Sequence, residues 1–268
     1  MTVSTTPGTS GAAARWLRRP RPRHYPEARL VCLPHAGGTA GEYLPWAARL
    51  PAQVELIAVQ YPGRQDRLDE PCAQSVPEIA DALAPALAPY ADRPLYLFGH
   101  SMGGLVAYEV AVRLEAGAGP APAGLFASDS LAPHQCKPPR EMLDDDAVEA
   151  DIRASGWSDP AVFEHPELRE LILPALLADV RAVLSYYRRD PVRLRCPIVA
   201  YAGNEGAAEA AAWGELTSGP ADWRQFDGDH FYLRSHQAEL VADVAARMSE
   251  WGNSPVGHQR DRQPMPGT

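Results

Sequence analysis

The sequence predicts an α/β fold in which helices cover both faces of a mostly parallel, doubly wound sheet. Three observations favour this class. Short apolar runs bounded by proline or glycine alternate with segments of helical periodicity along most of the 268 residues. The runs lack the alternation of polar and apolar side chains seen in half-exposed strands, which is typical of parallel strands buried on both faces. One long helical stretch without a strand interrupts the series and predicts an insertion.

Each element follows from its own local pattern. Six runs predict strands, at residues 29–33, 54–59, 94–98, 124–128, 197–201 and 223–226. Ser75 begins an S-x-x-E capping box, which predicts a helix running towards residue 90. Residues 102–115 carry apolar side chains at helical spacing and are followed by Gly117 as a stop signal. Residues 235–251 are expected to form a closing amphipathic helix.

The interruption covers residues 134–190 and contains only helical stretches, at 144–155 and 166–187. Because it is far longer than an ordinary connection between strands, we expect a helical lid inserted into one domain of residues 27–252. Residues 1–26 carry five arginines and no apolar stretch typical of a secretory signal. We expect them to form a disordered basic tail, and residues 253–268 to form a second disordered tail.

Composition excludes several classes of protein. Hydrophobic residues make up 46% and charged residues 22% of the chain, close to globular averages, which excludes wholesale disorder. No apolar run approaches the roughly 18 to 20 residues needed to span a bilayer, and a net charge of −9 argues against nucleic-acid binding. The four cysteines form no C-x-x-C pair, so no zinc cluster or disulfide framework is indicated. We expect a soluble cytoplasmic enzyme or binding domain.

Residues 99–103, GHSMG, match the G-x-S-x-G nucleophile elbow and lie where a predicted strand meets a predicted helix. In that turn Ser101 occupies a strained position, and glycines on both sides avoid clashes with neighbouring backbone. The turn raises the serine hydroxyl above the sheet edge and directs the N-terminus of the helix at the reacting centre. We therefore predict Ser101 as the nucleophile and the Met102 N–H as an oxyanion donor.

The remaining catalytic groups are predicted from their order in the chain. The loop after the first strand, PHAGG at residues 34–38, is expected to supply the second oxyanion donor. We favour the Ala36 N–H, with Gly37 as the neighbouring option, and interpret His35 as a side chain that braces the loop. The general base must follow the last strand, and His230, which lies between a glycine turn and the closing helix, fits best.

Four separated motifs resemble one family, in that family's own order. They are LPHAGG at residues 33–38, YPGR at 61–64, FGHSMGG at 98–104 and GDHFYL at 228–233. Together they resemble the type II thioesterases, editing hydrolases of polyketide and non-ribosomal peptide synthesis with the α/β-hydrolase fold. The resemblance covers roughly residues 27–252. It implies a helical lid over the active site, an acyl thioester substrate on the phosphopantetheine arm of an acyl or peptidyl carrier protein, and no metal or diffusible cofactor.

The sequence departs from the family at the carboxylate of the catalytic triad. The family places an aspartate in a G-x-x-D turn after the fifth strand, but residues 203–206 are GNEG. An imidazole without an acid partner loses its orientation and the stabilisation of its charged form. Two substitutes are available: Glu205, and Asp129 at the end of strand 124–128, where type I, chain-terminating thioesterases have a similar pattern. We favour Asp129, because a strand end supplies a short, rigid carboxylate at the same sheet edge.

Other charged residues have plainer interpretations. Asp227 and Asp229 flank His230 and are interpreted as turn residues. Arg64 is expected to brace a loop through backbone carbonyls, with contact to an acidic carrier protein as the alternative. Carrier proteins are usually acidic, so a chain of net charge −9 gains little from overall attraction and would dock through a local arginine or apolar patch.

The predicted reaction is acyl transfer in two steps. Ser101, deprotonated by His230, attacks the thioester carbonyl, and water then hydrolyses the acyl-enzyme. Three alternatives stay open from the sequence. They are chain release or cyclisation by an intramolecular nucleophile, a generic carboxylesterase or lipase, and a degenerate docking partner without turnover.

Overall fold

The computed structural model describes residues 11–138, 144–155 and 161–253. Within these residues seven strands form one sheet: β1 (Leu17–Arg18), β2 (Ala28–Leu33), β3 (Val54–Val59), β4 (Leu95–His100), β5 (Gly124–Ser128), β6 (Ile198–Ala202) and β7 (Ala221–Gln225). Their order across the sheet is β1-β3-β2-β4-β5-β6-β7. Only β1 pairs antiparallel, and the other strands pair in parallel. The six predicted strands and the predicted fold class are therefore confirmed.

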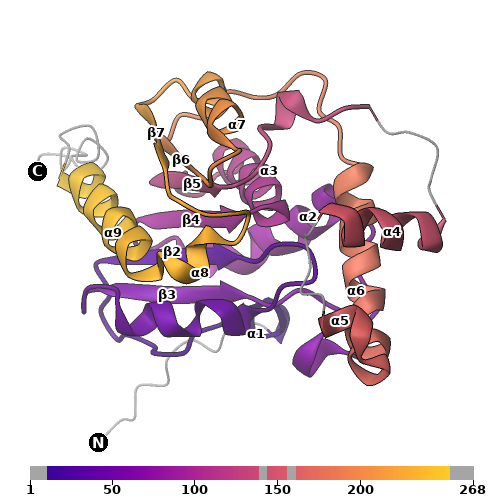
Figure 1. Ribbon diagram of the computed structural model, residues 1–268. Coiled ribbons are helices and arrows are strands. Elements are labelled where there is room, and N and C mark those ends of the chain that lie inside the picture. Colours follow the sequence, from indigo (N-terminus) through magenta and orange to yellow (C-terminus); the bar gives the residue numbers. More distant parts are fainter. Residues whose placement is uncertain (1–10, 139–143, 156–160, 254–268) are drawn as a thin grey trace, which may run out of the picture.

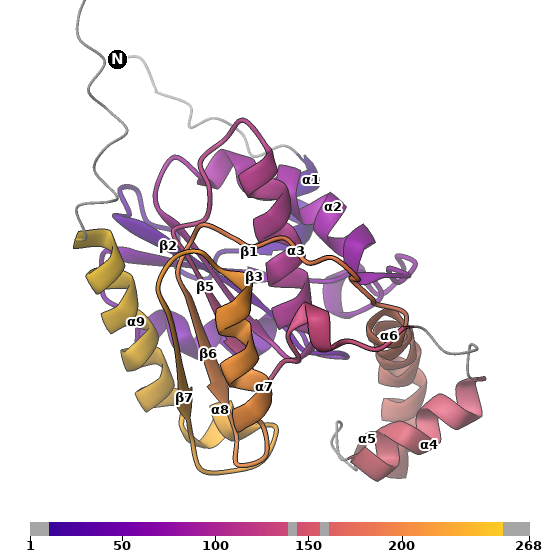
Figure 2. The ribbon, with the colours of Figure 1, turned by 90° about the horizontal axis from the view of Figure 1, so that it is seen from above.

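Helices cover both faces of the sheet. Successive side chains of a strand point to opposite faces, so each strand contributes apolar side chains to both helix layers. In β2, Val31 belongs to one apolar cluster and Leu30 to the other. The first cluster includes side chains of α2 (Val76–Leu87) and α3 (Met102–Ala116), and the second includes side chains of α9 (Gln237–Asn253). Figure 2 shows α9 and the α2–α3 pair on opposite sides of the sheet. This double burial explains why the central strands are apolar along their whole length.

Several short helices complete the domain. They are α1 (Gly11–Trp16), α7 (Ala207–Ala212), α8 (Tyr232–Ser235) and the 3-10 helices η1 (Ala40–Ala48), η2 (Gln65–Arg67), η3 (Ala88–Tyr90), η4 (Pro133–Gln135) and η5 (Trp213–Leu216). The predicted helix at residues 235–251 is present as the α8–α9 pair. None of the described helices is both long and apolar enough to cross a membrane.

Three helices are described in the insertion predicted at residues 134–190. They are α4 (Asp145–Ser155), α5 (Ala161–Glu164) and α6 (Pro166–Leu184). Apolar side chains of α4 and α6, including Ile152 and Leu176, form a small cluster of their own. Ala36, in the loop after β2, packs against this cluster. The insertion therefore contacts the sheet domain at the predicted oxyanion loop, and it lies to one side of the sheet in both views (Figures 1 and 2).

The expectation of a disordered basic N-terminal tail is wrong for residues 11–26. Here α1 leads into β1, which pairs with the edge of β3 and places Leu17 opposite Val59. The Gln60 N–H continues the contact by donating to the Trp16 carbonyl at 2.8 Å. Leu17 is buried in the first apolar cluster. Trp16 and Leu17 are two apolar residues among arginines, which is too short a run to show strand periodicity. The strand β1 could therefore not be predicted from the sequence pattern.

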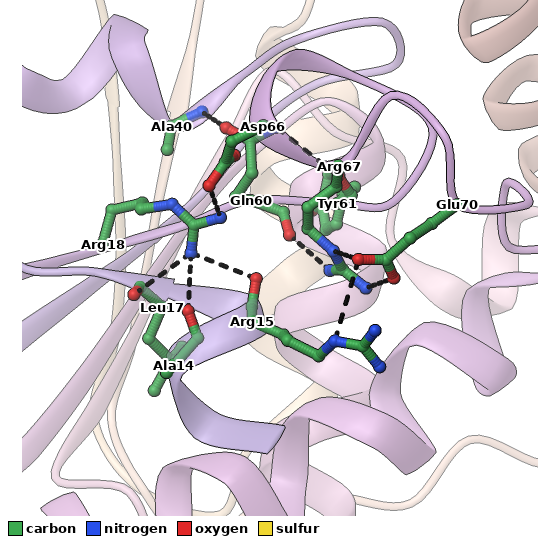
Figure 3. Close-up of polar contacts among 10 residues, drawn as sticks. All are labelled: Ala14, Arg15, Leu17, Arg18, Ala40, Gln60, Tyr61, Asp66, Arg67 and Glu70. Atoms are coloured by element: carbon green, nitrogen blue, oxygen red, sulfur yellow. Dashed lines mark hydrogen bonds and ion pairs between the residues drawn. The ribbon is translucent and has the colours of Figure 1, made fainter. Parts of the chain in front are cut away.

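Acidic side chains of the sheet domain form ion pairs with three arginines of this segment, Arg15, Arg18 and Arg19. Arg18 bonds Asp66 at 2.6 Å and also reaches the carbonyl oxygen of Ala14, as Figure 3 shows. Arg19 bonds the fully buried Glu55 at 2.5 Å. These contacts follow from tertiary structure and could not be assigned from spacing. Residues 1–10 and 254–268 lie outside the described residues, so the tails expected there stay a prediction.

Candidate active site

The turn between β4 and α3 has the strained geometry predicted for a nucleophile elbow. Ser101 has φ 55° and ψ −121°, a backbone conformation that residues other than glycine rarely adopt. A Cβ atom on Gly99 would lie 2.0 Å from the Gly103 carbonyl oxygen, and one on Gly103 would lie 2.1 Å from that of Leu33. The flanking glycines are therefore a steric requirement of the turn. The Ser101 N–H donates to the Ser128 carbonyl at 2.8 Å, which ties the turn to β5.

The structure brings Asp129, and not Glu205, to His230. Asp129 directly follows β5, and its Oδ2 lies 2.5 Å from the His230 Nδ1. The other carboxylate oxygen accepts a hydrogen bond from the Gly203 N–H at 3.1 Å. Both oxygens are therefore engaged, which fixes the carboxylate and directs the His230 Nε2 away from it. Glu205 is exposed in the turn after β6.

The turn after β6, which lacks the aspartate of the family pattern, packs around this pair. A Cβ atom on Gly206 would lie 2.8 Å from the Asp129 Oδ1, and one on Gly203 would lie 2.7 Å from the Asp229 carbonyl oxygen. The Asn204 N–H donates to the Gly228 carbonyl at 2.9 Å. Glycine at these positions leaves room for a carboxylate that enters from β5.

Aromatic rings surround the His230 imidazole. The ring centroids of His100 and His230 are 4.9 Å apart, and Phe231 lies 5.1 Å from His230. Phe231 also makes an edge contact with His35, 5.0 Å between centroids. The prediction that His35 is a bracing side chain fits this position. The side chain of His230 remains 23% exposed among these rings.

The two histidines beside His230 are neutral at physiological pH. Burial lowers the pKa of His100 well below its ordinary value, and the charge of His230 acts in the same direction. Burial is also the main reason why the pKa of His35 falls to about 3. The His100 Nδ1 bonds the Ser128 hydroxyl at 3.0 Å, and that hydroxyl bonds Tyr232 at 2.6 Å. Neither of these two rings is therefore charged beside His230.

The oxyanion loop between β2 and η1 shows which amide is free. The Gly37 N–H donates to the Asp179 Oδ2 of α6 at 2.8 Å, so this amide is already used inside the protein. The half-buried Ala36 donates no backbone hydrogen bond to any described residue. Met102 is the first residue of α3, so its N–H has no partner within the helix. Of the two options in the loop, the geometry favours Ala36.

Arg64 holds the oxyanion loop, residues 34–38, through a backbone carbonyl. Its Nη1 donates to the Gly38 carbonyl at 3.4 Å, and its Nε donates to the Pro62 carbonyl at 3.1 Å. The prediction of a brace through backbone carbonyls is confirmed. The alternative, contact with a carrier protein, does not fit a side chain that is only 6% exposed. Its ion-pair partner Asp179 was not predicted. The one feature of the sequence that could have indicated Asp179 is the presence of an acidic residue inside an apolar stretch of α6.

The other acidic residues occupy ordinary structural positions. Asp229 accepts a hydrogen bond from the Phe231 N–H at 2.8 Å, as expected for a turn residue, and Asp227 is exposed. Among the described residues, no three or more His, Cys, Asp or Glu side chains are grouped to hold a metal ion. The four cysteines are free thiols.

Comparison with known proteins gives one consistent result. The family model described as "Thioesterase domain" matches residues 28–248. Thioesterase PikA5 of Streptomyces venezuelae is 41% identical over 237 residues, covering 86% of this chain and 84% of that protein. Thioesterase TesA of Mycobacterium marinum is 40% identical over 223 residues, covering 80% and 88%.

A solved structure agrees with these sequence relatives. The type II thioesterase BorB from the borrelidin biosynthetic cluster superposes with a TM-score of 0.78 at 38% identity, covering 87% of this chain and 97% of BorB. The resemblance found in the four motifs is confirmed, together with the hydrolase class that it implied. The chain belongs to the thioesterase domain family.

Proposed function

We propose that this protein is an editing serine thioesterase of polyketide or non-ribosomal peptide synthesis. It hydrolyses acyl thioesters from the phosphopantetheine arm of acyl or peptidyl carrier proteins. The observation that carries the proposal is the contact between Asp129 and His230, at the same sheet edge as the strained Ser101 turn. The relationship to the type II thioesterase BorB supports the substrate class.

In the first step the Ser101 Oγ attacks the thioester carbonyl carbon while its proton passes to the His230 Nε2. Asp129 holds the Nδ1 proton and stabilises the imidazolium that forms. The tetrahedral oxyanion accepts hydrogen bonds from the Met102 and Ala36 amides. The carbon–sulfur bond then breaks, and the pantetheine sulfur takes the proton from His230 and leaves as a thiol.

In the second step water repeats the attack on the acyl-enzyme. His230 accepts a proton from the water, and the new tetrahedral intermediate collapses as the proton returns to the Ser101 oxygen. The acid product is released and the free serine is restored. These side chains and amides suffice for the chemistry, so we propose no resident metal or cofactor. The phosphopantetheine arrives with the carrier protein. We expect the enzyme to act beside its synthase in the cytoplasm.

The insertion at residues 134–190 is proposed to act as the lid of a single domain, residues 27–252. Its contact with Ala36 and the packing of Leu176 against Gly37 place α6 beside the proposed oxyanion hole. A helix in that position shields the acyl-enzyme from bulk water and forms one wall of the acyl site. The shape of this wall decides whether water or an internal nucleophile of the acyl chain completes the reaction.

The decisive test is single-turnover hydrolysis of an acyl-loaded carrier protein. Ser101→Ala should lower the rate by about 10³-fold or more, because the covalent route is lost. Ser249→Ala, on the exposed face of α9, is the matched control and should leave the rate unchanged. Equal hydrolysis by Ser101→Ala and the parent protein would refute the nucleophile.

The same assay separates the alternatives. A cyclic product in the mass spectrum indicates release by cyclisation, and activity on small esters alone indicates a carboxylesterase. A degenerate docking partner would fail to label at Ser101 with a fluorophosphonate. The proposal requires a linear acid as the product and fluorophosphonate labelling of Ser101.

A further inference from the structure

A buried ion pair connects the insertion to the oxyanion loop. Asp179 lies on α6, and its Oδ1 accepts a hydrogen bond from the Arg64 Nη2 at 2.9 Å, while the Arg64 Nη1 contacts Oδ2. The side chain of Asp179 is 1% exposed and that of Arg64 is 6% exposed. Arg64 follows β3, so the pair joins segments that are 115 residues apart in sequence.

The pair acts on the loop from two sides. The Asp179 Oδ2 accepts the Gly37 N–H, and Arg64 donates to the Gly38 carbonyl. Gly37 has φ 75°, and a Cβ atom there would lie 3.0 Å from the Leu176 Cδ1. The hydrogen bond and the close packing together hold the loop against α6. The peptide that carries the Ala36 carbonyl and the Gly37 amide is held by this helix.

Stability alone does not explain the arrangement. Removing two charges from water is costly, and replacement of a buried ion pair by apolar side chains is often neutral or stabilising. Burial on its own would lower the pKa of Arg64, but the hydrogen bond and charge of Asp179 outweigh burial and raise it. The carboxylate is fully used, by two guanidinium nitrogens and one amide. Such a network costs solvation energy and in return orients the Gly37 peptide.

We propose that Asp179 is a positioning residue, through which α6 orients the oxyanion loop and thereby the Ala36 N–H. Arg64 holds the Asp179 carboxylate in place, and the carboxylate holds the Gly37 amide. Ala36 is the residue next to Gly37, so the direction of its N–H depends on how that peptide is oriented. This inference rests on the proposed function, because the Ala36 amide is assigned there to the oxyanion. Asp179 itself does not touch the substrate.

Two double variants separate positioning from stability. Arg64→Met with Asp179→Asn removes both charges but keeps an amide oxygen that accepts the Gly37 N–H. Arg64→Met with Asp179→Leu also removes both charges and leaves the Gly37 amide without an acceptor. Neither variant leaves a buried charge unpaired, so both should fold, and thermal unfolding measures their stability directly. Glu55→Gln, which breaks a buried ion pair at the start of β3, is the control for general destabilisation.

The readout is the acylation rate of Ser101 in the full chain, at saturating acyl thioester. We expect the Asp179→Leu pair to react about 10-fold more slowly than the Asp179→Asn pair, since a small misplacement of a catalytic group has effects of this size or larger. The two double variants should have KM values within twofold of each other. Their rates should also have the same pH midpoint within experimental error, because Ser101, His230 and Asp129 are unchanged in both. Glu55→Gln should keep the parental rate.

Equal acylation rates for the two double variants would overturn the inference, as would a rate loss that only follows the loss of thermal stability. Labelling by a fluorophosphonate supplies a second measurement that does not depend on the thioester substrate, because its phosphoryl oxygen enters the same oxyanion hole. A parent protein that labels but does not hydrolyse thioesters refutes the proposed function. The difference in labelling rate between the two variants still decides the role of Asp179.

Discussion

The turns that follow β5 and β6 lie side by side at the catalytic edge, but only the turn after β5 supplies a carboxylate to His230. The first carries Asp129, whose carboxylate contacts His230. The second, residues 203–206, carries glycine at the position where the family pattern has its acid, and Gly206 lies against that same carboxylate. Parallel strands bring their carboxyl ends together, so either turn can supply a group to the same point in space. The comparison shows that one catalytic position can be filled from two places in the chain.

The first prediction tests which turn supplies the acid. Asp129→Asn should lower kcat by about 10⁴-fold, because the amide cannot stabilise the His230 imidazolium or hold its tautomer. Glu205→Gln, in the exposed turn after β6, is the matched control and should change kcat less than twofold. Steady-state hydrolysis of an acyl thioester measures both. A large loss in Glu205→Gln with an active Asp129→Asn would reverse the assignment.

The second prediction exchanges the acid between the two turns. Asp129→Gly empties the site and suits the positive φ of 44° at this residue. Adding Gly206→Asp should restore kcat by at least about 10-fold over the single variant, because a Cβ atom at 206 starts 2.8 Å from the present carboxylate. Residue 206 is also the N-cap of α7, where aspartate is favourable.

The matched control for this exchange is Asp129→Gly with Gly206→Asn, which has nearly the same shape but no charge. It should stay as slow as Asp129→Gly alone. If the aspartate and asparagine versions have equal rates, the two turns are not interchangeable, and the spatial equivalence proposed for them is wrong.

The third and smallest effect concerns the surroundings that both turns share. The pKa of His35 is lowered to about 3 in the folded protein, mainly by burial, so the unfolded chain binds a proton there at higher pH. Between its ordinary pKa, near 6.5, and pH 3, the unfolded state holds more protons, and stability falls as pH falls. One such group contributes a slope of at most about 1.4 kcal/mol per pH unit.

Chemical denaturation at pH 7, 6 and 5 measures this slope. His35→Asn should flatten it relative to the parent protein, because the residue that titrates on unfolding has been removed. Ser249→Ala, on the exposed face of α9, removes no titratable side chain and is the control that should leave the slope as it is. An unchanged slope in His35→Asn would show that His35 is not held neutral in the folded state.

Local features of the chain were predictable where neighbouring residues decide them. The apolar runs of β2 to β6 predict strands because each residue is buried on one of two covered faces. The GHSMG turn predicts the elbow because its geometry depends on the glycines beside Ser101. The start of α2 was predicted from Ser75, whose hydroxyl accepts the Glu78 N–H at 3.2 Å.

Contacts between distant segments could not be predicted in this way. The sequence by itself determined the individual strands, the nucleophile turn and the two candidate acids, because these depend on residues that are close together in the chain. Only the tertiary structure decided that Asp129 meets His230, 101 residues away, and that Asp179 meets Arg64. It also decided that residues 11–26 join the fold. The reason is physical: each of these contacts depends on how whole elements pack, and one polar or apolar residue carries no periodic signal of its distant partner.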